Sequence, residues 1–314
     1  MLPILNESGS IDACLRSLAE QDYRGPMEIL IADGGSTDDT LDRLDPWADH
    51  LTSLRIFENP DRYQSAGLNL LADVAHSEIL VRADAHTRYA HDYVSASVAA
   101  LNGAPNTAVG GPMLPAAMTP FGRAVAKAFS SPLAIGPARF HHATRPTEAD
   151  TVYLGAMRKD TWTSLGGMRT LPSGVAEDAD FYYRLRKAGG KVIVDPSIRT
   201  TYQPRETASS LWRQFYRYGL GKADMLYLNG EFPSWRPLAP LALLAGVTVG
   251  LVLLGAGDPR VLTLVLSGWL VAIGIAGRLD PLVSIAIAVM HVAYGLGLAR
   301  GLLRRPAAVR SLVR

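Results

Sequence analysis

The sequence predicts an α/β body with a mostly parallel sheet flanked by helices, followed by a C-terminal membrane segment. Short apolar runs bounded by turn residues alternate with stretches of helical period, as in successive β-α-β units. Polar residues gather directly after several of these runs, where ligands bind in such sheets. Behind this body, apolar residues fill most of positions 237–305. A catalytic body with a membrane segment behind it suggests a substrate delivered at a bilayer.

The elements of the body follow one another in regular order. The expected strands span residues 27–32, 54–57, 79–83, 108–111, 152–157 and 191–194. The expected helices span residues 10–20, 37–44, 64–75 and 92–101. This succession predicts a sheet whose strands are mainly parallel and joined by helices.

The membrane segment contains three apolar runs, at residues 238–256, 261–277 and 282–303. A membrane helix needs roughly 20 apolar residues, so the first and third runs are long enough and the second is marginal. We therefore expect two to three membrane helices. Arginines and a lysine precede the first run and arginines follow the last, which favours a cytoplasmic location for both ends and an even number of crossings. The middle run would then be re-entrant or interfacial.

Composition narrows the class of protein. The 314 residues suffice for one large domain or for a domain plus a membrane anchor. A net charge of +2 gives no broad surface for a polyanion, so we expect no nucleic-acid partner. The single cysteine, Cys14, excludes an internal disulfide and a zinc knuckle and indicates a reduced, cytoplasmic body. The start of the chain does not resemble a signal peptide, so insertion would be driven by the C-terminal spans.

The end of the first expected strand, with the polar residues that follow it, lies within residues 29–40. An apolar strand runs into Asp33, two glycines permit a tight turn, and Ser36 or Thr37 can cap the next helix. An ordinary strand-to-helix loop explains this stretch as well as a binding site does.

The second polar strand end carries Asp84 and His86, one residue apart. Two such side chains after a buried strand can chelate Mg²⁺ or Mn²⁺ that also holds phosphate oxygens. An Asp-x-His pair arises easily by chance, and its place at a strand end is what favours a function.

Two further motifs have simple structural explanations. Asp178 and Asp180 open an expected helix, where acidic residues are favoured by the helix dipole. The alternative is that one of these carboxylates acts as a general base. Downstream, residues 212–219 are aromatic and basic, which is typical of a helix lying on lipid headgroups.

Taken together, these stretches resemble the family 2 glycosyltransferases, in the membrane-associated branch typified by succinoglycan-type exopolysaccharide glucosyltransferases. The matching stretches, in the order of the family, are residues 3–7, 32–38, 59–60, 65–69, 81–86, 155–156, 177–180 with 184–186, and 214–219. The resemblance implies a GT-A fold. It assigns residues 1–112 to a nucleotide-sugar-binding half and 113–230 to an acceptor-binding half, while the apolar runs assign residues 237–305 to the membrane.

The resemblance also implies roles for individual residues. Residues expected to bind the donor are Asn6, Glu7, Asp33, Ser36, Asn69, Arg82 and Tyr218, with Asp33 as the partner of the uracil base. Asp84 and His86 take the place of the family's metal-binding Asp-x-Asp. Asp178 falls on the motif that supplies the general base. Gln214 and Arg217 fall, with Tyr218, on the motif that lines the donor diphosphate and the acceptor channel.

Three departures from the family pattern carry expectations of their own. Only Met1 and Leu2 precede the first motif, where the family has a full strand, so we expect either a truncated chain or a misassigned start. His86 replaces a second aspartate and suits a somewhat softer ion. Tyr218 stands where many processive members have Trp, which favours transfer of a single sugar.

These implications describe an inverting, metal-dependent glycosyltransferase of the inner membrane with its catalytic domain on the cytoplasmic side. The expected cofactor is Mn²⁺ or Mg²⁺, the donor a UDP-linked sugar, and the acceptor a polyprenyl-diphosphate-linked saccharide of exopolysaccharide synthesis. One alternative is a sugar-nucleotide nucleotidyltransferase, which would show a Gly-rich basic loop near its start. The other is a catalytically silent membrane-binding module, which would tolerate loss of Asp84 and Asp178.

Overall fold

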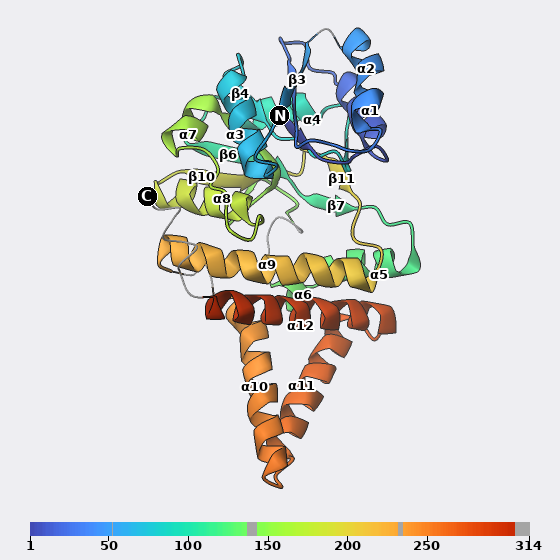
Figure 1. Ribbon diagram of the computed structural model, residues 1–314, viewed down its shortest axis with the longest axis vertical. Coiled ribbons are helices and arrows are strands. Elements are labelled where there is room, and N and C mark those ends of the chain that lie inside the picture. The colour runs from blue at the N-terminus through green and yellow to red at the C-terminus, as the bar shows by residue number, and fades with distance from the viewer. Residues whose placement is uncertain (52, 137–142, 232–234, 305–314) are drawn as a thin grey trace. The chain divides into compact units, whose positions relative to one another are not determined.

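The computed structural model describes residues 1–51, 53–136, 143–231 and 235–304 (Figure 1). These residues form two compact units. Unit 1 consists of the chain up to Pro115, the described residues from 143 to Thr170, and Glu177–Gln203. Unit 2 consists of the described residues from Ala116 to 136, Leu171–Ala176, and the described residues from Pro204 onwards.

Unit 1 alternates strands and helices. Its strands are β1 (Leu2–Ile4), β2 (Ile29–Asp33), β3 (Leu54–Glu58), β4 (Ile79–Val81), β5 (Thr87–Tyr89), β6 (Thr107–Gly111), β7 (Met113–Pro115), β8 (Thr147–Glu148), β9 (Tyr153–Arg158), β10 (Lys191–Val194) and β11 (Thr200–Tyr202). Its helices are α1 (Ile11–Ala19), α2 (Thr40–His50), α3 (Gln64–Val74), α4 (Tyr93–Leu101), α7 (Lys159–Ser164) and α8 (Glu177–Lys187). The expected alternation is confirmed, with most bounds shifted by a few residues.

The sheets of unit 1 bring several strand ends to one edge. β1, β2 and β3 are parallel neighbours, and Ile4, Asp33 and Glu58 lie side by side at their carboxyl ends. A second sheet has the order β4-β9-β6-β10-β8, with β6 and β10 parallel and β9 antiparallel to both β4 and β6. The backbone of Met1 joins the two sheets, because its amino group donates to the Val81 carbonyl and its carbonyl accepts from Ala83 N–H. The carboxyl ends of β1, β2 and β4 therefore share one edge.

Helices cover both faces of the sheet that contains β2. Along β2, Ile29 and Ile31 join one buried cluster with side chains of α1 and α4. The alternate residues Leu30 and Ala32 join a second cluster with side chains of α3 and α8. Strands buried on both faces read as continuous apolar runs, which explains why the sequence showed them clearly.

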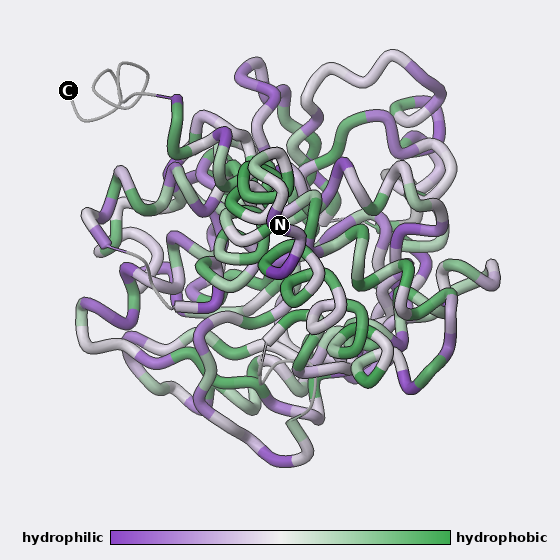
Figure 2. The backbone as a smooth tube through the Cα atoms, turned by 90° about the horizontal axis from the view of Figure 1, so that it is seen from below, coloured by the Kyte–Doolittle hydropathy of each residue, from purple (hydrophilic) through white to green (hydrophobic). Residues whose placement is uncertain are grey.

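Unit 2 is helical. Its helices are α5 (Pro120–Phe129), α6 (Pro132–Ile135), α9 (Ala208–Asn229), α10 (Leu238–Gly255), α11 (Arg260–Ala276) and α12 (Pro281–Leu303). Thr119, Thr207 and Asp280 cap α5, α9 and α12 with side-chain oxygens that accept backbone N–H groups. By length and composition, α10 and α12 could span a membrane, and α11 is the shorter apolar helix among the described residues. Hydropathy colouring shows apolar residues along these helices (Figure 2).

Candidate active site

Asp33 ends β2 and organises the turn that follows it. Its side chain is buried, and its two carboxylate oxygens accept hydrogen bonds from Gly35 N–H at 3.0 Å, from Ser36 N–H and from the Ser36 hydroxyl at 2.6 Å. Gly35 has a φ of +80°, a conformation that residues with a Cβ rarely adopt. The glycines after the strand thus let the chain fold back over the Asp33 carboxylate.

Asn6 ties this turn to the end of β1. Its N–H donates to the Ser36 hydroxyl at 2.9 Å, and its side-chain oxygen accepts from Thr37 N–H at 2.8 Å. Asn6 itself has a φ of +56°, which asparagine tolerates better than most residues. The predicted donor-binding residues Asn6, Asp33 and Ser36 therefore form one hydrogen-bonded group.

Asp84 and His86 lie together beyond the end of β4, and Glu7 joins them. His86 Nδ1 is 3.3 Å from Asp84 Oδ1 and 3.3 Å from Glu7 Oε2. His86 N–H also donates to Asp84 Oδ1 at 2.9 Å. Glu7 comes from the first motif and Asp84 from a strand end about eighty positions later, so the sheet brings together what the chain separates.

The charges of this group depend on one another. Burial raises the pKa of Glu7 above its usual range, although a hydrogen bond from Ser10 opposes the shift. Burial also acts to raise the pKa of Asp84, but its hydrogen bonds and charge interaction with His86 outweigh burial and hold that pKa below its ordinary value. Asp84 is therefore ionised near neutral pH.

The donor atoms at this edge fit a divalent ion that is completed by its substrate. Carboxylate oxygens and an imidazole nitrogen suit Mn²⁺ and, less closely, Mg²⁺. In the structure Glu7, Asp84 and His86 bond to one another, and no group of three or more such side chains is arranged as a ready-made metal site within the described residues. Two protein ligands, Asp84 and His86, would thus need phosphate oxygens to complete the coordination.

Arg82 lies just before Asp84 and is almost completely buried. Its Nε and Nη1 atoms have no hydrogen-bond partner among the described residues. Burial opposes its charge, yet Tyr182, Asp178 and Glu177 together raise the pKa of Arg82 above its usual range. The same guanidinium helps to lower the pKa of Asp84. The buried Arg82 charge therefore favours the ionised form of Asp84 and is itself favoured by the acidic residues at the start of α8.

The two aspartates at the start of α8 differ in their surroundings. Asp180 is fully buried, and its carboxylate pairs with Arg184 at 2.8 Å and Arg169 at 3.7 Å. Arg184 in turn donates to the carbonyls of Leu165 and Gly167, so this pair holds the preceding loop. Asp178 is only partly buried and accepts a hydrogen bond from Ala179 N–H. The Asp180 carboxylate thus has a structural role in these ion pairs, and Asp178 remains the predicted base.

Asn69 also supports a loop. Its side-chain NH₂ donates to the Met168 carbonyl at 2.8 Å, and its side-chain oxygen accepts from Met168 N–H at 2.8 Å. Both polar atoms of the amide are thereby paired with backbone. Its expected contact with the donor stays a prediction.

The remaining predicted residues lie on α9, in unit 2. Gln214 donates to the Tyr218 hydroxyl at 2.9 Å, one helical turn away. Arg217 Nη2 donates to the Gly174 carbonyl at 3.3 Å. Arg217 and Tyr218 are exposed, as expected of side chains that contact a ligand or lipid headgroups.

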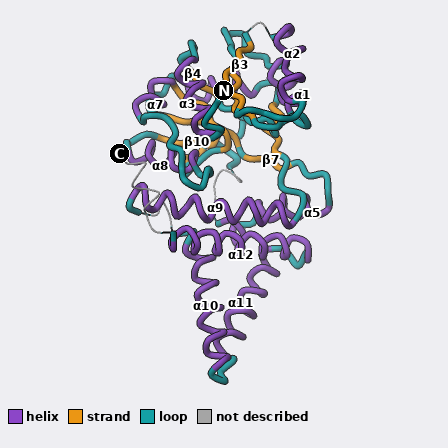
Figure 3. The backbone as a smooth tube through the Cα atoms, viewed as in Figure 1, coloured by secondary structure: helices purple, strands orange, loops and turns teal. Residues whose placement is uncertain are grey.

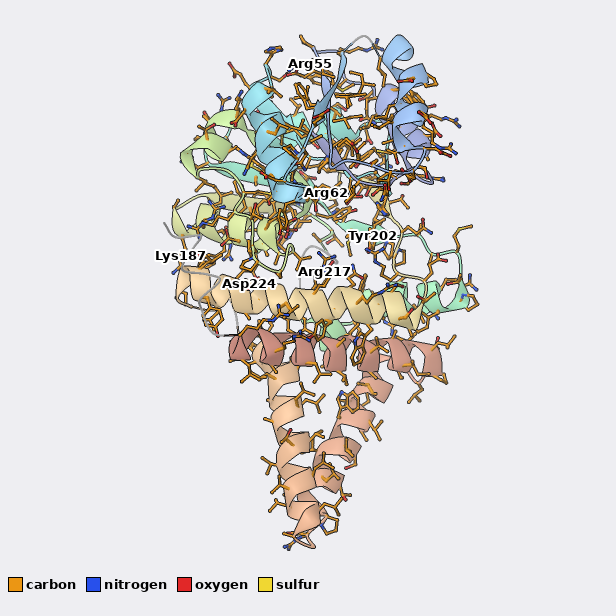
Figure 4. The ribbon with its side chains drawn as sticks, in the orientation of Figure 1. Arg55, Arg62, Lys187, Tyr202, Arg217 and Asp224 are labelled. Atoms are coloured by element: carbon orange, nitrogen blue, oxygen red, sulfur yellow. The ribbon has the colours of Figure 1, made fainter. Side chains whose placement is uncertain are left out.

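Asp224, which the sequence did not single out, contacts the same segment as Arg217. Asp224 on α9 accepts a hydrogen bond from Ser173 N–H at 2.8 Å, and α9 approaches Val175 closely at Gly221. Arg217, Gly221 and Asp224 therefore hold the Leu171–Ala176 segment. Their spacing of four and three residues, which places side chains on one helix face, was the available signal. Figure 4 labels Arg217 and Asp224 along α9. The segment leads directly into α8 and Asp178.

Comparison with known proteins identifies the fold and the family. Residues 1–158 match the model of glycosyl transferase family 2. The chain belongs to this family. The succinoglycan biosynthesis protein ExoA of Rhizobium meliloti (strain 1021) is 30% identical over 96% of this chain and 94% of its own length. The chain is therefore a glycosyltransferase, and its resemblance to the succinoglycan proteins is confirmed.

Two more distant similarities agree with this conclusion. A dolichyl N-acetyl-alpha-D-glucosaminyl phosphate 3-beta-D-2,3-diacetamido-2,3-dideoxy-beta-D-glucuronosyltransferase of Methanococcus voltae is 25% identical over 72% of this chain and 73% of its own. The structure of mannosyltransferase PcManGT from Pyrobaculum calidifontis, in complex with GDP-Man and Mn²⁺, matches with a TM-score of 0.66 at 20% identity, over 93% of this chain and 85% of that chain. The glycosyltransferase has the GT-A fold.

Proposed function

We propose that this glycosyltransferase moves one sugar from a UDP-linked donor to a membrane-held, polyprenyl-diphosphate-linked saccharide during exopolysaccharide synthesis. The reaction is a metal-dependent single displacement with inversion. The observation that carries the proposal is the gathering of Asn6, Asp33, Asp84 and His86 at the shared carboxyl edge of β1, β2 and β4. That edge is where ligands bind in open α/β sheets.

The nucleoside end of the donor lies at the Asp33 turn. The Asp33 carboxylate accepts hydrogen bonds and can accept one more from an N–H of uracil. Asn6 and Ser36 fix this turn to the end of β1. Uracil presents such an N–H, so a uridine nucleotide fits this site, and the donor panel below separates it from guanosine, whose base also presents an N–H to a carboxylate.

The diphosphate end lies at Asp84 and His86. Mn²⁺ or Mg²⁺ bound there would offset the negative charge that develops on the leaving diphosphate. Arg82 adds a buried positive charge close to Asp84. Arg217 and Gln214 on α9 are further candidates for contact with the diphosphate, through the motif that they share with the family.

Asp178 supplies the base. As the acceptor hydroxyl oxygen bonds to the anomeric carbon, the bond from that carbon to the diphosphate breaks, and Asp178 takes the hydroxyl proton. The acceptor oxygen gains the sugar, and the electrons of the broken bond leave with the nucleoside diphosphate. The configuration of the anomeric carbon inverts.

The apolar helices of unit 2 and the name of one relative support a membrane-held acceptor. Within the described residues, two helices are long and apolar enough to span a membrane, and one relative is named for a dolichyl-phosphate-linked substrate. Residues 1–112 then bind the donor, residues 113–230 the acceptor, and residues 237–305 the membrane. Basic residues on both flanks of the last segment favour the cytoplasmic side of the inner membrane. Tyr218 in the place of Trp favours release after one transfer.

A donor panel tests the proposal. Membranes containing the enzyme would be incubated with UDP- and GDP-linked sugars, and nucleotide release and label in the lipid extract would be measured together. We expect one UDP-sugar to give both signals, EDTA to abolish them, and Mn²⁺ or Mg²⁺ to restore them. Full transfer in chelator would overturn the metal role, and label in water-soluble products alone would overturn the lipid acceptor.

A further inference from the structure

Helices α10 and α11 form a closely packed apolar hairpin within unit 2. Gly246 and Gly250 stand four residues apart on α10, and Gly250 lies so close to Leu262 of α11 that a Cβ would come within 2.7 Å of the Leu262 backbone. Two glycines at this spacing are a common packing motif of membrane helices. Gly250 and Ile273 are the buried residues of the two helices.

The outer surface of the hairpin is apolar and open. Leu264 is 73% exposed and Val252 is 69% exposed, although both side chains are apolar. Neither helix carries a charged residue beyond Arg260 at the start of α11. At about 1.5 Å per residue, the 18 residues of α10 extend about 27 Å, close to the roughly 30 Å hydrocarbon core of a bilayer. Lipid is the environment that fits this surface.

The turn of the hairpin is polar, as a membrane crossing requires. It contains Asp258, whose carboxylate pairs with Arg260 at 2.7 Å. The other end of α10 is preceded by Trp235, which is 71% exposed, and by Arg236. Tryptophan is typical of the membrane–water boundary and arginine of its cytoplasmic side.

Helix α12 is longer than α11, but it is packed within unit 2. In its apolar window 44% of the residues are buried, against 6% in α10. Its His291 contacts the Ala134 carbonyl of α6 at 3.1 Å and accepts a hydrogen bond from Trp269, and Asp280 at its start pairs with Lys127 of α5 at 3.1 Å. Such polar contacts hold α12 against other helices of unit 2.

Helix α12 also runs along α9 (Figure 3). Gly219 of α9 has no room for a Cβ against Tyr294, and Gly297 has none against Tyr216. Further along, the Tyr227 hydroxyl donates to the Leu302 carbonyl at 2.6 Å. If α12 crossed the bilayer, α9 would have to enter the hydrocarbon with it.

Helix α9 is unsuited to hydrocarbon. It carries Arg213, Arg217, Lys222 and Asp224 within 22 residues. Charged side chains inside a membrane are strongly unfavourable unless they face a partner or a cavity. Opposite its buried face, α12 exposes Leu282, Ile285, Leu296 and Leu303 along one stripe, as a helix at a lipid surface does.

We infer that the α10–α11 hairpin crosses the membrane and that α12 lies along the membrane surface beside α9. The chain then crosses twice, through the shorter apolar helix α11 and not through the longer α12. This inference rests on the membrane attachment in the proposed function and assigns that attachment to particular helices.

Cysteine labelling in membrane vesicles tests the inference with the full chain. The only natural cysteine, Cys14, is buried and can be replaced by alanine to give a background without thiols. Single cysteines would be placed at the hairpin turn (Ala256→Cys), between α11 and α12 (Leu279→Cys) and at the end of α12 (Leu303→Cys). Glu20→Cys, on an exposed position of unit 1, reports the side of the catalytic unit.

A membrane-impermeant maleimide would be applied to sealed vesicles of either orientation. We expect Leu279→Cys, Leu303→Cys and Glu20→Cys to be labelled from one side and Ala256→Cys from the other. Labelling of Leu279→Cys and Leu303→Cys from opposite sides would show that α12 crosses and overturn the inference. Labelling of Ala256→Cys from the same side as Leu279→Cys would overturn the crossing of the hairpin.

The same samples separate this inference from the proposal on which it rests. Each variant would first be extracted with carbonate at high pH. Retention in the membrane fraction is expected for all four. Release of the chain into the supernatant would refute membrane insertion altogether, whereas retention with a different labelling pattern would refute only the assignment to the hairpin.

Discussion

The predicted metal ligands Asp84 and His86 follow strand β4. In the structure His86 contacts both Asp84 and Glu7, which comes from the first motif. Asp84→Asn removes the charge of the predicted metal ligand but keeps an oxygen that can accept the hydrogen bond from His86 N–H. We expect the rate of sugar transfer to fall by roughly 10²-fold or more, because in the proposed mechanism the metal stabilises the leaving diphosphate. A titration of activity with Mn²⁺ checks this, and millimolar metal should not restore the variant.

The matched control is Asp160→Asn, which removes a carboxylate from an exposed pair with Arg158 in the same unit. Its activity and its dependence on Mn²⁺ should equal those of the unaltered enzyme. Equal activity of Asp84→Asn and Asp160→Asn would refute the role of Asp84.

Substitutions of the two aspartates of α8 should affect different quantities, turnover for Asp178 and thermal stability for Asp180. Asp178→Asn should lower turnover by about 10² to 10⁴, the usual contribution of a general base, while UDP still binds. Asp180→Asn should instead lower the melting temperature, because it weakens the buried pair with Arg184. Rates per folded molecule and thermal unfolding would be measured for both, and the reverse pattern would move the base to Asp180.

Asp224 should act through the segment that precedes Asp178. Ala176, at the end of that segment, has a φ of +70°, so the backbone there is held in an unfavourable conformation by its neighbours. Asp224→Ala removes the acceptor of Ser173 N–H, and we expect a lower kcat with little change in the KM of the donor. Asp224→Asn keeps an acceptor oxygen and should restore most of the kcat. An equal loss in both variants, or a change in KM alone, would contradict a positioning role.

At the scale of elements, the contact of α9 with α12 depends on glycine. Gly297→Ala must push α12 away from Tyr216, and overpacking of this kind typically destabilises a protein by about 1 to 3 kcal/mol. Gly274→Ala is the control, because a Cβ there meets only the end of Leu279 at 3.9 Å and alanine favours a helix by about 1 kcal/mol. Thermal unfolding in detergent should show a lower melting temperature for the first variant alone.

The elements that the sequence predicted share a physical signature. β2 and β6 are buried along their whole length and flanked by turns, so their apolar runs stand out. The three-residue strands β5, β7 and β11 were not predicted, because so short a run has no readable period. Asp33 and Asp84 were found because each ends a visible strand.

Other parts of the site depend on contacts between distant residues. Nothing in the sequence near Glu7 indicates His86, and nothing near Ser173 indicates Asp224. The packing of α12 on α9 was missed for the same reason. Length and hydropathy describe each apolar run alone, whereas burial against a polar helix is a property of the pair.

At the scale of the whole molecule, charge and hydropathy divide the chain. A charged side chain at the centre of a membrane helix costs about 2.5 to 3.5 kcal/mol, so the charges of α9 together disfavour its insertion strongly. Helices α10 and α11 of the hairpin carry no such charges apart from Arg260 at the start of α11. The chain thus contains both a family 2 catalytic fold and an apolar hairpin suited to a bilayer, which is consistent with the lipid-linked acceptor that we propose.

The stereochemistry of the lipid-linked product tests the central claim most directly. The product would be isolated from membranes supplied with an α-linked UDP-sugar, and the new glycosidic bond would be examined by NMR. Single displacement with Asp178 as base predicts a β-linkage in the enzyme's product, and little or no product with Asp178→Asn. An α-linkage, or an undiminished yield with Asp178→Asn, would contradict the account.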